Sequence, residues 1–325
     1  MASQRIVLFG GAGFIGSALA AQLSGQGHEV TVFDSLYTGK KENLAACEKT
    51  PHFKFIKADM RKLPDVRKAV KGADIVYHLA ANADIRGGME NTYLDLDMNF
   101  ITTYNLLEAM RHEDVKRIVF TSSSAVYGEP SVFPTPESCG PLIPTSIYGA
   151  SKSASESYIS AFCEAFGYSS VILRFVNILG PGNNHGVVGD FIRKLKDNPK
   201  KLQILGDGKQ RKSSLHISDC LSAIELAVSK SKDKVGIYNF GNNDYVTVDD
   251  IARIICEEMD LRGVAFEYTG GPRGWIGDMP FVFLDNSKIK ALGWKPKYNS
   301  SQAVRQAAHE MLARPDLGDK HQKHF

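Results

Sequence analysis

The sequence predicts an α/β protein, in which a doubly wound parallel sheet is joined to a second, smaller α+β domain. Three observations indicate this fold class. Short apolar runs alternate with longer segments of helical spacing from the start of the chain. The runs are continuously apolar, as is typical of parallel strands that are covered on both faces. A glycine-rich turn follows the first run and opens a helical segment.

The predicted strands, in chain order, are six apolar runs: residues 6–9, 30–33, 53–56, 75–79, 118–121 and 171–175. Two long segments between them, residues 93–111 and 148–166, have helical spacing. After about Asn177, glycine and proline recur, beginning with the loop at 180–186, which indicates a second domain laid over the sheet. Residues 238–241 are a candidate strand that returns to the first sheet.

These changes in composition predict the domain boundaries. The first domain spans residues 1–176, with a returning segment near 215–245. The second comprises residues 177–214 and 246–315, and residues 316–325 form a polar tail that is expected to fray.

Composition excludes several classes of protein. Lysine and arginine number 39 against 36 aspartates and glutamates, and a net charge of +3 gives no general affinity for nucleic acid or an anionic membrane. No apolar run approaches the ~20 residues that cross a bilayer, and we expect no signal peptide because a strand-like run leads straight into the glycine turn. The 5 cysteines are scattered and form no metal-spaced pair, so we expect reduced thiols, a cytoplasmic protein and no bound metal.

The glycine turn, Gly10-Gly11-Ala12-Gly13-Phe14-Ile15-Gly16, is the first candidate binding motif. Its spacing alone is weak, since roughly 0.2 such matches per chain are expected by chance. Its position between a strand and a helix is more specific, because glycine lets the backbone approach a pyrophosphate and the helix N-terminus favours the phosphate charge. A tight turn without a ligand is the alternative. We expect a dinucleotide site of the Rossmann type at these residues: Gly10, Gly13, Phe14, Ile15 and Gly16.

Three further segments at strand ends are candidates for the same cofactor. Asp34 closes the second strand, where its carboxylate accepts hydrogen bonds from a ribose and repels a 2′-phosphate, so NAD is favoured over NADP. Asp59, followed by Met60, ends the third strand and is placed to accept from an adenine amino group, or else to cap a helix. Small residues at the end of the fourth strand suit a close approach of the cofactor, although packing explains them nearly as well: Leu79, Ala80 and Ala81.

A tyrosine and a lysine four residues apart, Tyr148 and Lys152, are the candidate reacting groups. About 0.9 such pairs are expected by chance, and Tyr37/Lys41 is a second one. The surroundings of Tyr148 suit a helix, which places the two side chains on one face, whereas Tyr37 lies in a polar turn. A neighbouring ammonium lowers the pKa of a tyrosine toward the range of a general base. An exposed helix face is the alternative.

A run of hydroxyl side chains, Ser122-Ser123-Ser124, ends the fifth strand at the sheet edge where open α/β sheets bind ligands. A hydroxyl there is placed to hydrogen-bond a substrate oxygen beside the Tyr148 phenol. Hydroxyl-rich loops are common, so this run alone does not decide the function.

Together, GGAGFIG, Asp34, TSSSAVYG and YGASK resemble the extended short-chain dehydrogenase/reductase superfamily, and the likeness covers about residues 4–310. It is strongest to the NAD-dependent epimerase/dehydratase family and, within it, to the UDP-glucose 4-epimerases. The resemblance implies that Tyr148 is the acid/base, that Lys152 holds the nicotinamide ribose and lowers the tyrosine pKa, and that Ser123 is the catalytic hydroxyl. It also implies cofactor contacts at Ser122 and Asn99, and nucleotide-sugar contacts at Asn177, Arg211, Arg273 and Asp278.

The resemblance also guides the choice of reaction. Related dehydratases carry Asp-Glu after the catalytic hydroxyl residue and related decarboxylases a Glu before Val-Tyr-Gly, whereas this chain has Ser124 and Ala125 there. We therefore expect interconversion of UDP-glucose and UDP-galactose by hydride transfer at C4 through a 4-keto intermediate. By the same resemblance, helices 93–111 and 148–166 form the interface of a homodimer.

Two alternatives stay open. The first is a 4-epimerase or 4-reductase of another nucleotide sugar: Val282, in place of a bulkier residue, would admit UDP-GlcNAc, and Arg86 or Arg193 would pair with the carboxylate of UDP-glucuronate. The second is a redox-sensing NAD(P)-binding regulator, which is disfavoured because all three candidate catalytic residues are present. His185, in the glycine-rich loop, is a further candidate contact, with a solvent-exposed position equally expected.

Overall fold

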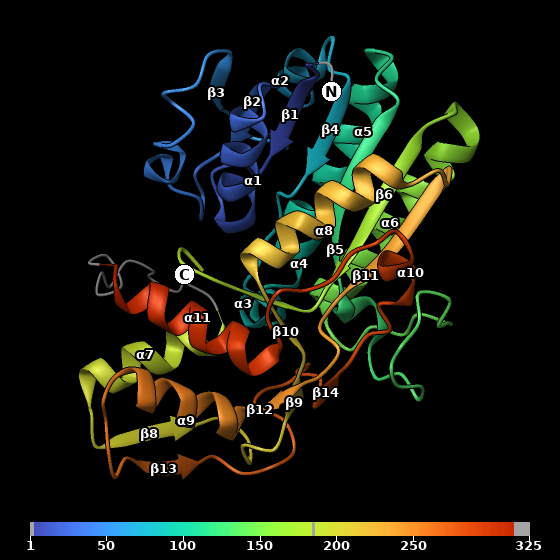
Figure 1. Cartoon of the computed structure of the whole chain (residues 1–325). Coiled ribbons are helices and arrows are strands. Elements are labelled where there is room, and N and C mark those ends of the chain that lie inside the picture. The colour runs from blue at the N-terminus through green and yellow to red at the C-terminus, as the bar shows by residue number, and fades with distance from the viewer. Residues whose placement is uncertain (1–2, 184–185, 315–325) are drawn as a thin grey trace.

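The structure is a computed structural model that describes residues 3–183 and 186–314. Within these residues its centre is a seven-stranded sheet (Figure 1) with the strand order β11-β6-β5-β4-β1-β2-β3. All neighbouring strands are parallel, which confirms the predicted fold class. The strands are β1 (Arg5–Phe9), β2 (Glu29–Asp34), β3 (Phe53–Lys57), β4 (Ile75–His78), β5 (Arg117–Ser123), β6 (Ser169–Phe175) and the returning strand β11 (Val235–Phe240).

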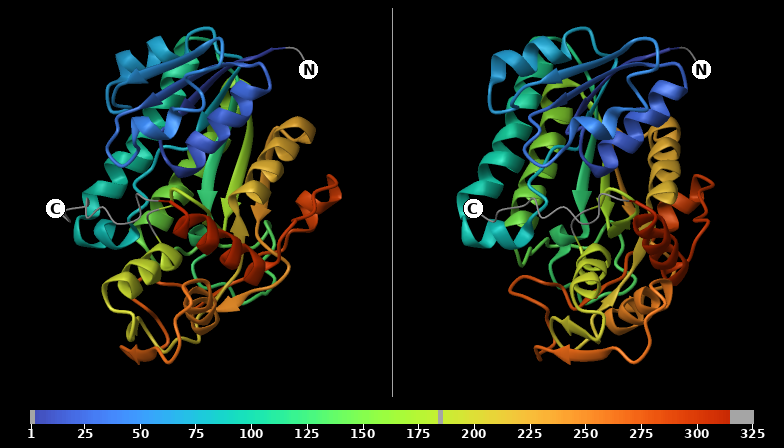
Figure 2. Two further views of the ribbon diagram at one scale, coloured as in Figure 1. Left: turned by 60° about the vertical axis from the view of Figure 1, so that its left-hand side comes forward. Right: turned by 90° about the vertical axis from the view of Figure 1, so that its left-hand side faces the viewer.

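Helices cover both faces of this sheet, as the two views in Figure 2 show. On β1, Ile6 and Leu8 belong to one buried apolar cluster, whereas Val7 and Phe9 belong to the other. The continuously apolar strands are therefore a consequence of helices on both sides. One layer contains α1 (Phe14–Gly25) and α8 (Ile217–Lys230), and the opposite layer contains α2 (Leu63–Val70), α5 (Thr102–His112) and α6 (Ile147–Phe166).

One predicted strand differs from the structure in its surroundings. The sequence predicts β3 as a strand covered on both faces, but β3 is the edge strand, and Lys54, Ile56 and Lys57 are exposed. Exposed lysines on an edge strand hinder pairing with another chain. In β3 the half-buried Phe53 and Phe55 alternate with the exposed Lys54 and Ile56, so one face of this strand is covered and the other is open.

The predicted continuous helix at 93–111 is divided in the structure. It consists of α4 (Thr92–Asp95), a π-helical segment η2 (Leu96–Ile101) and then α5. The hydroxyl groups of Thr102 and Thr103 donate to the carbonyl oxygens of Met98 (2.7 Å) and Asn99 (2.6 Å). These bonds satisfy two carbonyl oxygens of the π-helical segment, whose turn is wider than that of an α-helix. An α-helix and a short π-helical segment give similar spacings of apolar residues, so the sequence does not distinguish the two.

Most of the chain after β6, apart from α8 and β11, forms the smaller part of the molecule, which lies below the carboxyl ends of the sheet strands in Figure 1. Strands β8 and β13 pair, β9 lies between β12 and β14, and β7 pairs with β10. Helices α7, α9 and α11 share one apolar cluster. The elements are β7 (Asn177–Leu179), α7 (Val187–Asp197), β8 (Lys201–Ile204), β9 (Arg211–Lys212), β10 (Ser214–His216), β12 (Val246–Thr247), α9 (Val248–Glu258), β13 (Ala265–Tyr268), β14 (Phe281–Val282) and α11 (Ser300–Leu312).

Four short helices complete the described chain: η1 (Lys41–Leu44), α3 (Ile85–Glu90), η3 (Ser124–Tyr127) and α10 (Ser287–Ala291). Across residues 3–183 and 186–314, no helix is long and apolar enough to cross a membrane. The domain boundaries given above stay predictions. His185 and the polar tail at 316–325 lie outside the described residues.

His78, the last residue of β4, is a buried titratable group at the carboxyl end of this strand. Its side chain is fully buried, with Nε2 2.9 Å from Oγ1 of Thr103 and the ring centre 5.3 Å from that of Phe120. Burial, together with the nearby charge of Lys152, lowers the pKa of His78 to about 3. The folded protein therefore holds this imidazole neutral.

We expect His78→Gln to remove part of the instability of the protein in acid. An unfolded histidine titrates near 6.5. Below that pH the unfolded chain binds a proton that the folded chain does not, so the free energy of unfolding falls as the pH falls. Between pH 6.5 and 4.5 this group should cost the wild type about 2–3 kcal/mol. Urea unfolding at constant ionic strength measures the effect, and equal pH slopes in the two proteins would contradict it.

Candidate active site

The glycine turn lies between β1 and α1, at the carboxyl edge of the sheet. Gly10 has a φ of +79°, and a Cβ there would lie 2.5 Å from the backbone nitrogen of Ala80, so only glycine fits between β1 and β4. A Cβ on Gly16 would lie 2.3 Å from the carbonyl oxygen of Gly10. A Cβ on Gly13 would meet that same oxygen only at 3.4 Å. Protein packing therefore requires Gly10 and Gly16, and the space at Gly13 is open to a phosphate.

We expect Gly16→Ala to lower the free energy of unfolding by about 1–3 kcal/mol, because the new methyl group would force the backbone of the turn apart. Gly13→Ala is the matched control. It should leave the stability of the NAD-free chain within about 0.5 kcal/mol of wild type and instead weaken NAD binding. Urea unfolding without NAD and titration with NAD separate the two effects. A Gly16→Ala chain as stable as wild type would contradict the tight packing of this turn.

Asp34 is fixed at the end of β2 beside this turn. Its Oδ2 accepts from the backbone nitrogen of Ala12 at 2.9 Å, and its Oδ1 accepts from that of Leu36 at 2.8 Å. Each carboxylate oxygen keeps a further lone pair that can accept from a ribose hydroxyl. Phe14 and Ile15 begin α1 and are half-buried. The arrangement is compatible with the predicted roles of these residues.

Asp59 and Met60 follow β3. The Asp59 carboxylate accepts from the backbone nitrogen of Arg61 at 2.9 Å and from its Nη2 at 2.5 Å. The hydrogen bonds from Arg61 lower the pKa of Asp59. Lys62 occupies the N-cap of α2, and its side chain makes no capping bond, so the alternative of Asp59 as a helix cap is wrong. Met60 is buried. The predicted contacts of Asp59 and Met60 with adenine stay predictions.

Residues Leu79, Ala80 and Ala81 lead from β4 into a buried polar network. The Asn99 side chain accepts from the backbone nitrogen of Asn82 at 2.7 Å and donates to Asp95 (3.0 Å) and Ser151 (2.9 Å). Burial raises the pKa of Asp95. Both amide hydrogens of Asn99 are donated to other residues of the protein. Its amide oxygen holds the backbone of Asn82, in the loop after β4. Its direct contact with the cofactor stays a prediction.

Ser123, Tyr148 and Lys152 lie together at the carboxyl end of β5. Helix α6 begins at Ser146, whose hydroxyl accepts from the backbone nitrogen of Gly149 at 3.1 Å, so Tyr148 lies in the first turn. The Ser123 side chain is near enough to the Tyr148 phenol to influence its pKa. Nζ of Lys152 is 5.8 Å from the centre of the Tyr148 ring. The structure thus brings the three predicted catalytic residues to one place.

The pKa values of the pair do not follow the sequence-based expectation. Burial raises the pKa of Tyr148 to about 12, although the nearby Ser123 side chain opposes this shift. Burial also lowers the pKa of Lys152 to about 8, against the charges of Asp95 and Glu156. The expected lowering of the tyrosine pKa by Lys152 is therefore wrong for the protein chain alone. Burial is the largest cause acting on the phenol, while Nζ of Lys152 donates to the carbonyl oxygen of Thr121 at 2.9 Å.

Ser122 faces away from Ser123, into the protein. Its hydroxyl donates to Oε1 of Glu156 at 2.5 Å, and Oε2 of Glu156 accepts from Nη2 of Arg174 at 2.6 Å. Both charged side chains are buried, with 6% and 4% of their surface exposed. The side chain of Ser122 is thus committed to this ion pair, and only its backbone is left for the predicted cofactor contact.

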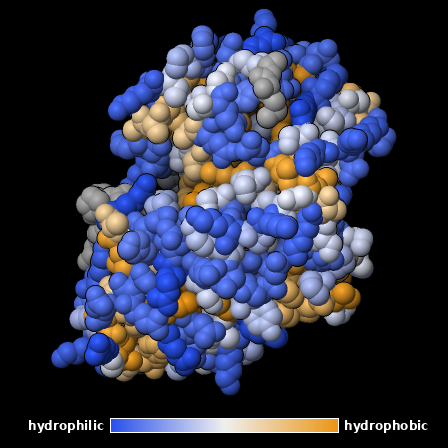
Figure 3. Space-filling model, in the orientation of Figure 1, coloured by the Kyte–Doolittle hydropathy of each residue, from blue (hydrophilic) through white to orange (hydrophobic). Residues whose placement is uncertain are grey.

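A cleft of about 120 Å³ opens beside Ser123, where the sheet meets the smaller part of the molecule. In Figure 3 hydrophobic side chains gather at mid-height, along this boundary. Asn177, at the start of β7, lines the cleft. Lys212 from β9 and Trp275 from the loop before β14 also line it, and the sequence analysis did not predict either of them.

The two arginines predicted to bind the nucleotide sugar do not line this cleft. Arg211 is exposed, with its guanidinium 3.8 Å from the centre of the Phe281 ring. Arg273 forms an ion pair with Glu129 and donates to the carbonyl oxygen of Asp278 at 2.9 Å. Their predicted contacts with the nucleotide sugar stay predictions.

Asp278 does line the cleft, but its carboxylate is engaged within the protein. Oδ2 accepts from the backbone nitrogen of Gly274 at 3.0 Å, and Oδ1 accepts from Nζ of Lys212 at 2.7 Å. Among the described residues that line the cleft, Lys212 is the cation. The position of Asp278 therefore indicates a residue that holds the loop and Lys212, and its predicted contact with the substrate stays a prediction.

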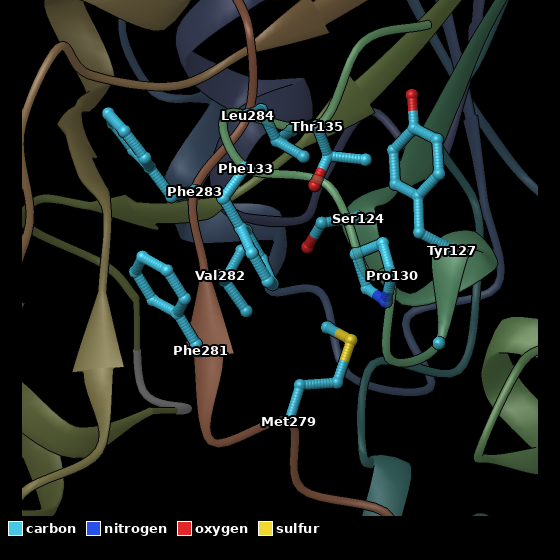
Figure 4. Close-up of a pocket in the computed structure, with 11 residues that line it drawn as sticks. Ser124, Tyr127, Pro130, Phe133, Thr135, Met279, Phe281, Val282, Phe283 and Leu284 are labelled. Atoms are coloured by element: carbon cyan, nitrogen blue, oxygen red, sulfur yellow. The ribbon is translucent and has the colours of Figure 1, made fainter. Parts of the chain in front are cut away.

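A much smaller apolar pocket of about 10 Å³ adjoins the cleft (Figure 4). The rings of Phe133, Phe281 and Phe283 lie along one side of it. Val282 lines both the pocket and the cleft. The phenol of Tyr127 points away from the pocket and donates to Oδ1 of Asn239 at 2.7 Å. Val282 therefore lies where the cleft meets the pocket that these phenylalanine rings line.

Comparison with known proteins assigns the class. The chain belongs to the NAD dependent epimerase/dehydratase family, whose sequence profile matches residues 6–241. A putative UDP-glucose 4-epimerase of Methanocaldococcus jannaschii is 35% identical over 94% of this chain and 98% of the relative. The crystal structure of the Thermus thermophilus UDP-glucose 4-epimerase in complex with NAD has a TM-score of 0.84 at 32% identity, covering 95% of this chain and 99% of that one.

A third relative acts on a different sugar. The UDP-N-acetylglucosamine 4-epimerase of Methanobrevibacter ruminantium M1, solved with UDP-N-acetylmuramic acid, has a TM-score of 0.86 at 28% identity, over 96% of this chain and 99% of that one. The predictions of an enzyme and of NAD as its cofactor are confirmed by these comparisons. The residues present fit NAD: the space at Gly13 admits a pyrophosphate, and Asp34 faces the same turn.

Proposed function

We propose that this enzyme is a UDP-glucose 4-epimerase that interconverts UDP-glucose and UDP-galactose. The observation that carries this proposal is the composition of the cleft beside the reacting residues. Among the described residues that line it, Asp278 is the carboxylate, and Asp278 is bound to Lys212. Ser124 and Ala125 stand next to Ser123, where an acid or base would be needed for loss of water. Epimerisation needs no acid or base other than Tyr148.

The mechanism assigns one proton transfer to the chain. Tyr148 takes the proton of the C4 hydroxyl as hydride leaves C4, and later returns it to the same oxygen. NAD, when bound, supplies the hydride acceptor, a positive charge near the phenol and the returning hydride. Ser123 holds the C4 oxygen beside the phenol, and Lys152 holds the nicotinamide ribose. Between the two transfers the 4-keto sugar turns in the cleft, so that hydride returns to its other face.

The test is to incubate the purified protein with UDP-galactose, without added cofactor, and to follow the sugar products by NMR. UDP-glucose is the expected product, and its formation without added NAD would mean that NAD stays bound through purification. Absence of product with NAD supplied, from protein that binds both NAD and UDP, would reject this substrate. The same assay with UDP-GlcNAc and UDP-glucuronate then identifies the alternative.

UDP-GlcNAc is the second candidate substrate. The supporting observation is that Val282 lines both the cleft and the apolar pocket, so a bulkier side chain at this position would take up space beside the cleft. UDP-glucuronate has less support, because the predicted partners of its carboxylate lie elsewhere. Arg86 is exposed on α3, and Arg193 lies 3.7 Å from Asp190 on α7. Neither residue lines the cleft.

We also infer that the enzyme is a homodimer through α4–η2–α5 and α6. Two elements of this face are adjacent, since the rings of Phe100 and Tyr158 are 4.9 Å apart. Exposed aromatic and aliphatic side chains on one face typically mark an interface. The molecular mass in solution, measured by light scattering, tests this. The exposed apolar residues of the face are Tyr93, Leu96, Tyr104, Tyr158 and Phe166.

The five cysteines are free thiols, which supports a cytoplasmic location.

A further inference from the structure

Trp275 is a half-buried aromatic residue of the cleft to which the mechanism assigns no role. It lies in the loop at 269–280, which connects β13 to β14 and passes the start of α6. A Cβ on Gly277 would lie 3.4 Å both from Cβ of Ser146 and from Cζ3 of Trp275. The indole is therefore close to the residue that caps α6, two positions before Tyr148.

Hydrogen bonds fix this loop to the rest of the cleft wall. The Asp278 carboxylate accepts from the backbone nitrogen of Gly274 at 3.0 Å and from Nζ of Lys212 at 2.7 Å, so it joins the loop to β9. The carbonyl oxygen of Trp275 accepts from the backbone nitrogen of Asp278 at 3.1 Å. Arg273 donates to the carbonyl oxygen of Asp278 at 2.9 Å. Hydrogen bonds at Gly274 and at Asp278 therefore fix the backbone on both sides of Trp275.

We propose that the Trp275 indole is the surface against which the hexose ring of the nucleotide sugar packs. This proposal rests on the proposed function, because Trp275 and Ser123 line the same cleft. An aromatic face contacts the C–H groups of a sugar ring over a large area and imposes little direction on it, whereas a set of hydrogen bonds favours one orientation. An epimerase must hold the sugar with either face of C4 toward the hydride donor. A broad indole contact suits both orientations.

The chain provides its own fluorescent probe for this contact, because it has only 2 tryptophans. Trp294 is 3% exposed, and its Nε1 donates to Oγ of Ser222 at 3.1 Å, so it is shielded from the cleft. In a Tyr148→Phe background, which prevents turnover, UDP-glucose and UDP-galactose should change the tryptophan emission much more than UDP does. Adding Trp275→Phe should remove the sugar-dependent change. Equal responses to UDP and UDP-glucose would overturn the proposal.

Kinetics give a second, independent readout. Trp275→Ala should raise KM for both UDP-sugars by about ten-fold, while the inhibition constant of UDP changes by less than about two-fold. Trp275→Phe keeps an aromatic face and should retain most of the affinity. Ile276→Ala is the matched control, since Ile276 is 79% exposed on the same loop and should leave both constants unchanged. A Trp275→Ala enzyme with wild-type KM for both sugars would overturn the proposal.

The two readouts also separate this proposal from the proposed reaction. A sugar-dependent change in emission without any turnover of UDP-galactose by the wild type would refute the 4-epimerase and leave the role of Trp275 intact. Turnover of UDP-galactose without a sugar-dependent signal would refute the role of Trp275 alone.

Discussion

Tyr148→Phe is expected to lower kcat by about 10³-fold or more, because the proposed mechanism assigns to the phenol both the removal and the return of the proton of the sugar hydroxyl. The substitution keeps the aromatic ring in the first turn of α6, which Ser146 caps, so the helix should remain intact. The conversion of UDP-galactose to UDP-glucose at saturating substrate measures the loss. The same protein should still contain NAD, which can be measured after denaturation.

Tyr37→Phe is the control for this experiment. It removes a phenol of the second tyrosine–lysine pair, and Tyr37 is 62% exposed, so activity should not change. A Tyr148→Phe enzyme that kept a tenth or more of the wild-type kcat would refute Tyr148 as the acid/base. A loss of activity together with a loss of NAD would instead mean that the phenol holds the cofactor.

The pKa of about 12 for Tyr148 shows how far the reacting residue depends on its surroundings. At neutral pH the chain alone keeps the phenol protonated, and a cation near the phenol oxygen is needed to favour its ionised form. In the chain alone Lys152 does not lower the pKa of Tyr148, and its Nζ lies 5.8 Å from the centre of the phenol ring. We therefore expect Tyr148 to act as the proposed base only when NAD is bound beside it.

The sequence predicts those parts of the fold and site whose cause is local. The strands up to β6 and the start of α6 follow from apolar runs and helical spacing, because each segment carries its own burial pattern. The turn at Gly10 and Gly16 is predictable for a similar reason: its glycines meet backbone atoms that are near in the sequence or in the adjacent strand. Tyr148 and Lys152 are predictable because one helix turn joins them.

The missed residues owe their positions to distant parts of the chain. Lys212 and Trp275 reach the cleft because β9 pairs with β14, a contact across about 70 residues that no local pattern encodes. Asp95 is buried because Gly88 lets its carboxylate approach: a Cβ there would lie 2.0 Å from Oδ2 of Asp95. From the sequence alone, Asp95 has the spacing of a solvated helical residue. The pairing of Lys212 with Asp278 likewise joins residues that are 66 positions apart, which no local pattern encodes.

The buried ion pair below the site gives the largest expected effect on stability. The guanidinium of Arg174, on β6, binds both carboxylate oxygens of Glu156, on α6, and also donates to the Tyr127 phenol oxygen at 2.8 Å. Arg174→Met should lower the free energy of unfolding by about 3–5 kcal/mol, because Glu156 would be left buried with Ser122 as its remaining side-chain donor. Urea unfolding at a fixed NAD concentration measures this loss.

Two further variants separate the lost pairing from lost packing. Lys234→Met breaks an ion pair with Glu164 on the same helix, but these side chains are 47% and 74% exposed, so the loss should stay below about 1 kcal/mol. Arg174→Met combined with Glu156→Met should be more stable than Arg174→Met alone, because no buried charge is left unpaired. A double variant that is less stable than the single one would mean that packing and the bond from Ser122 carry the effect. Activity should fall with Arg174→Met as well, since Glu156 lies one helix turn beyond Lys152 and holds Ser122 beside Ser123.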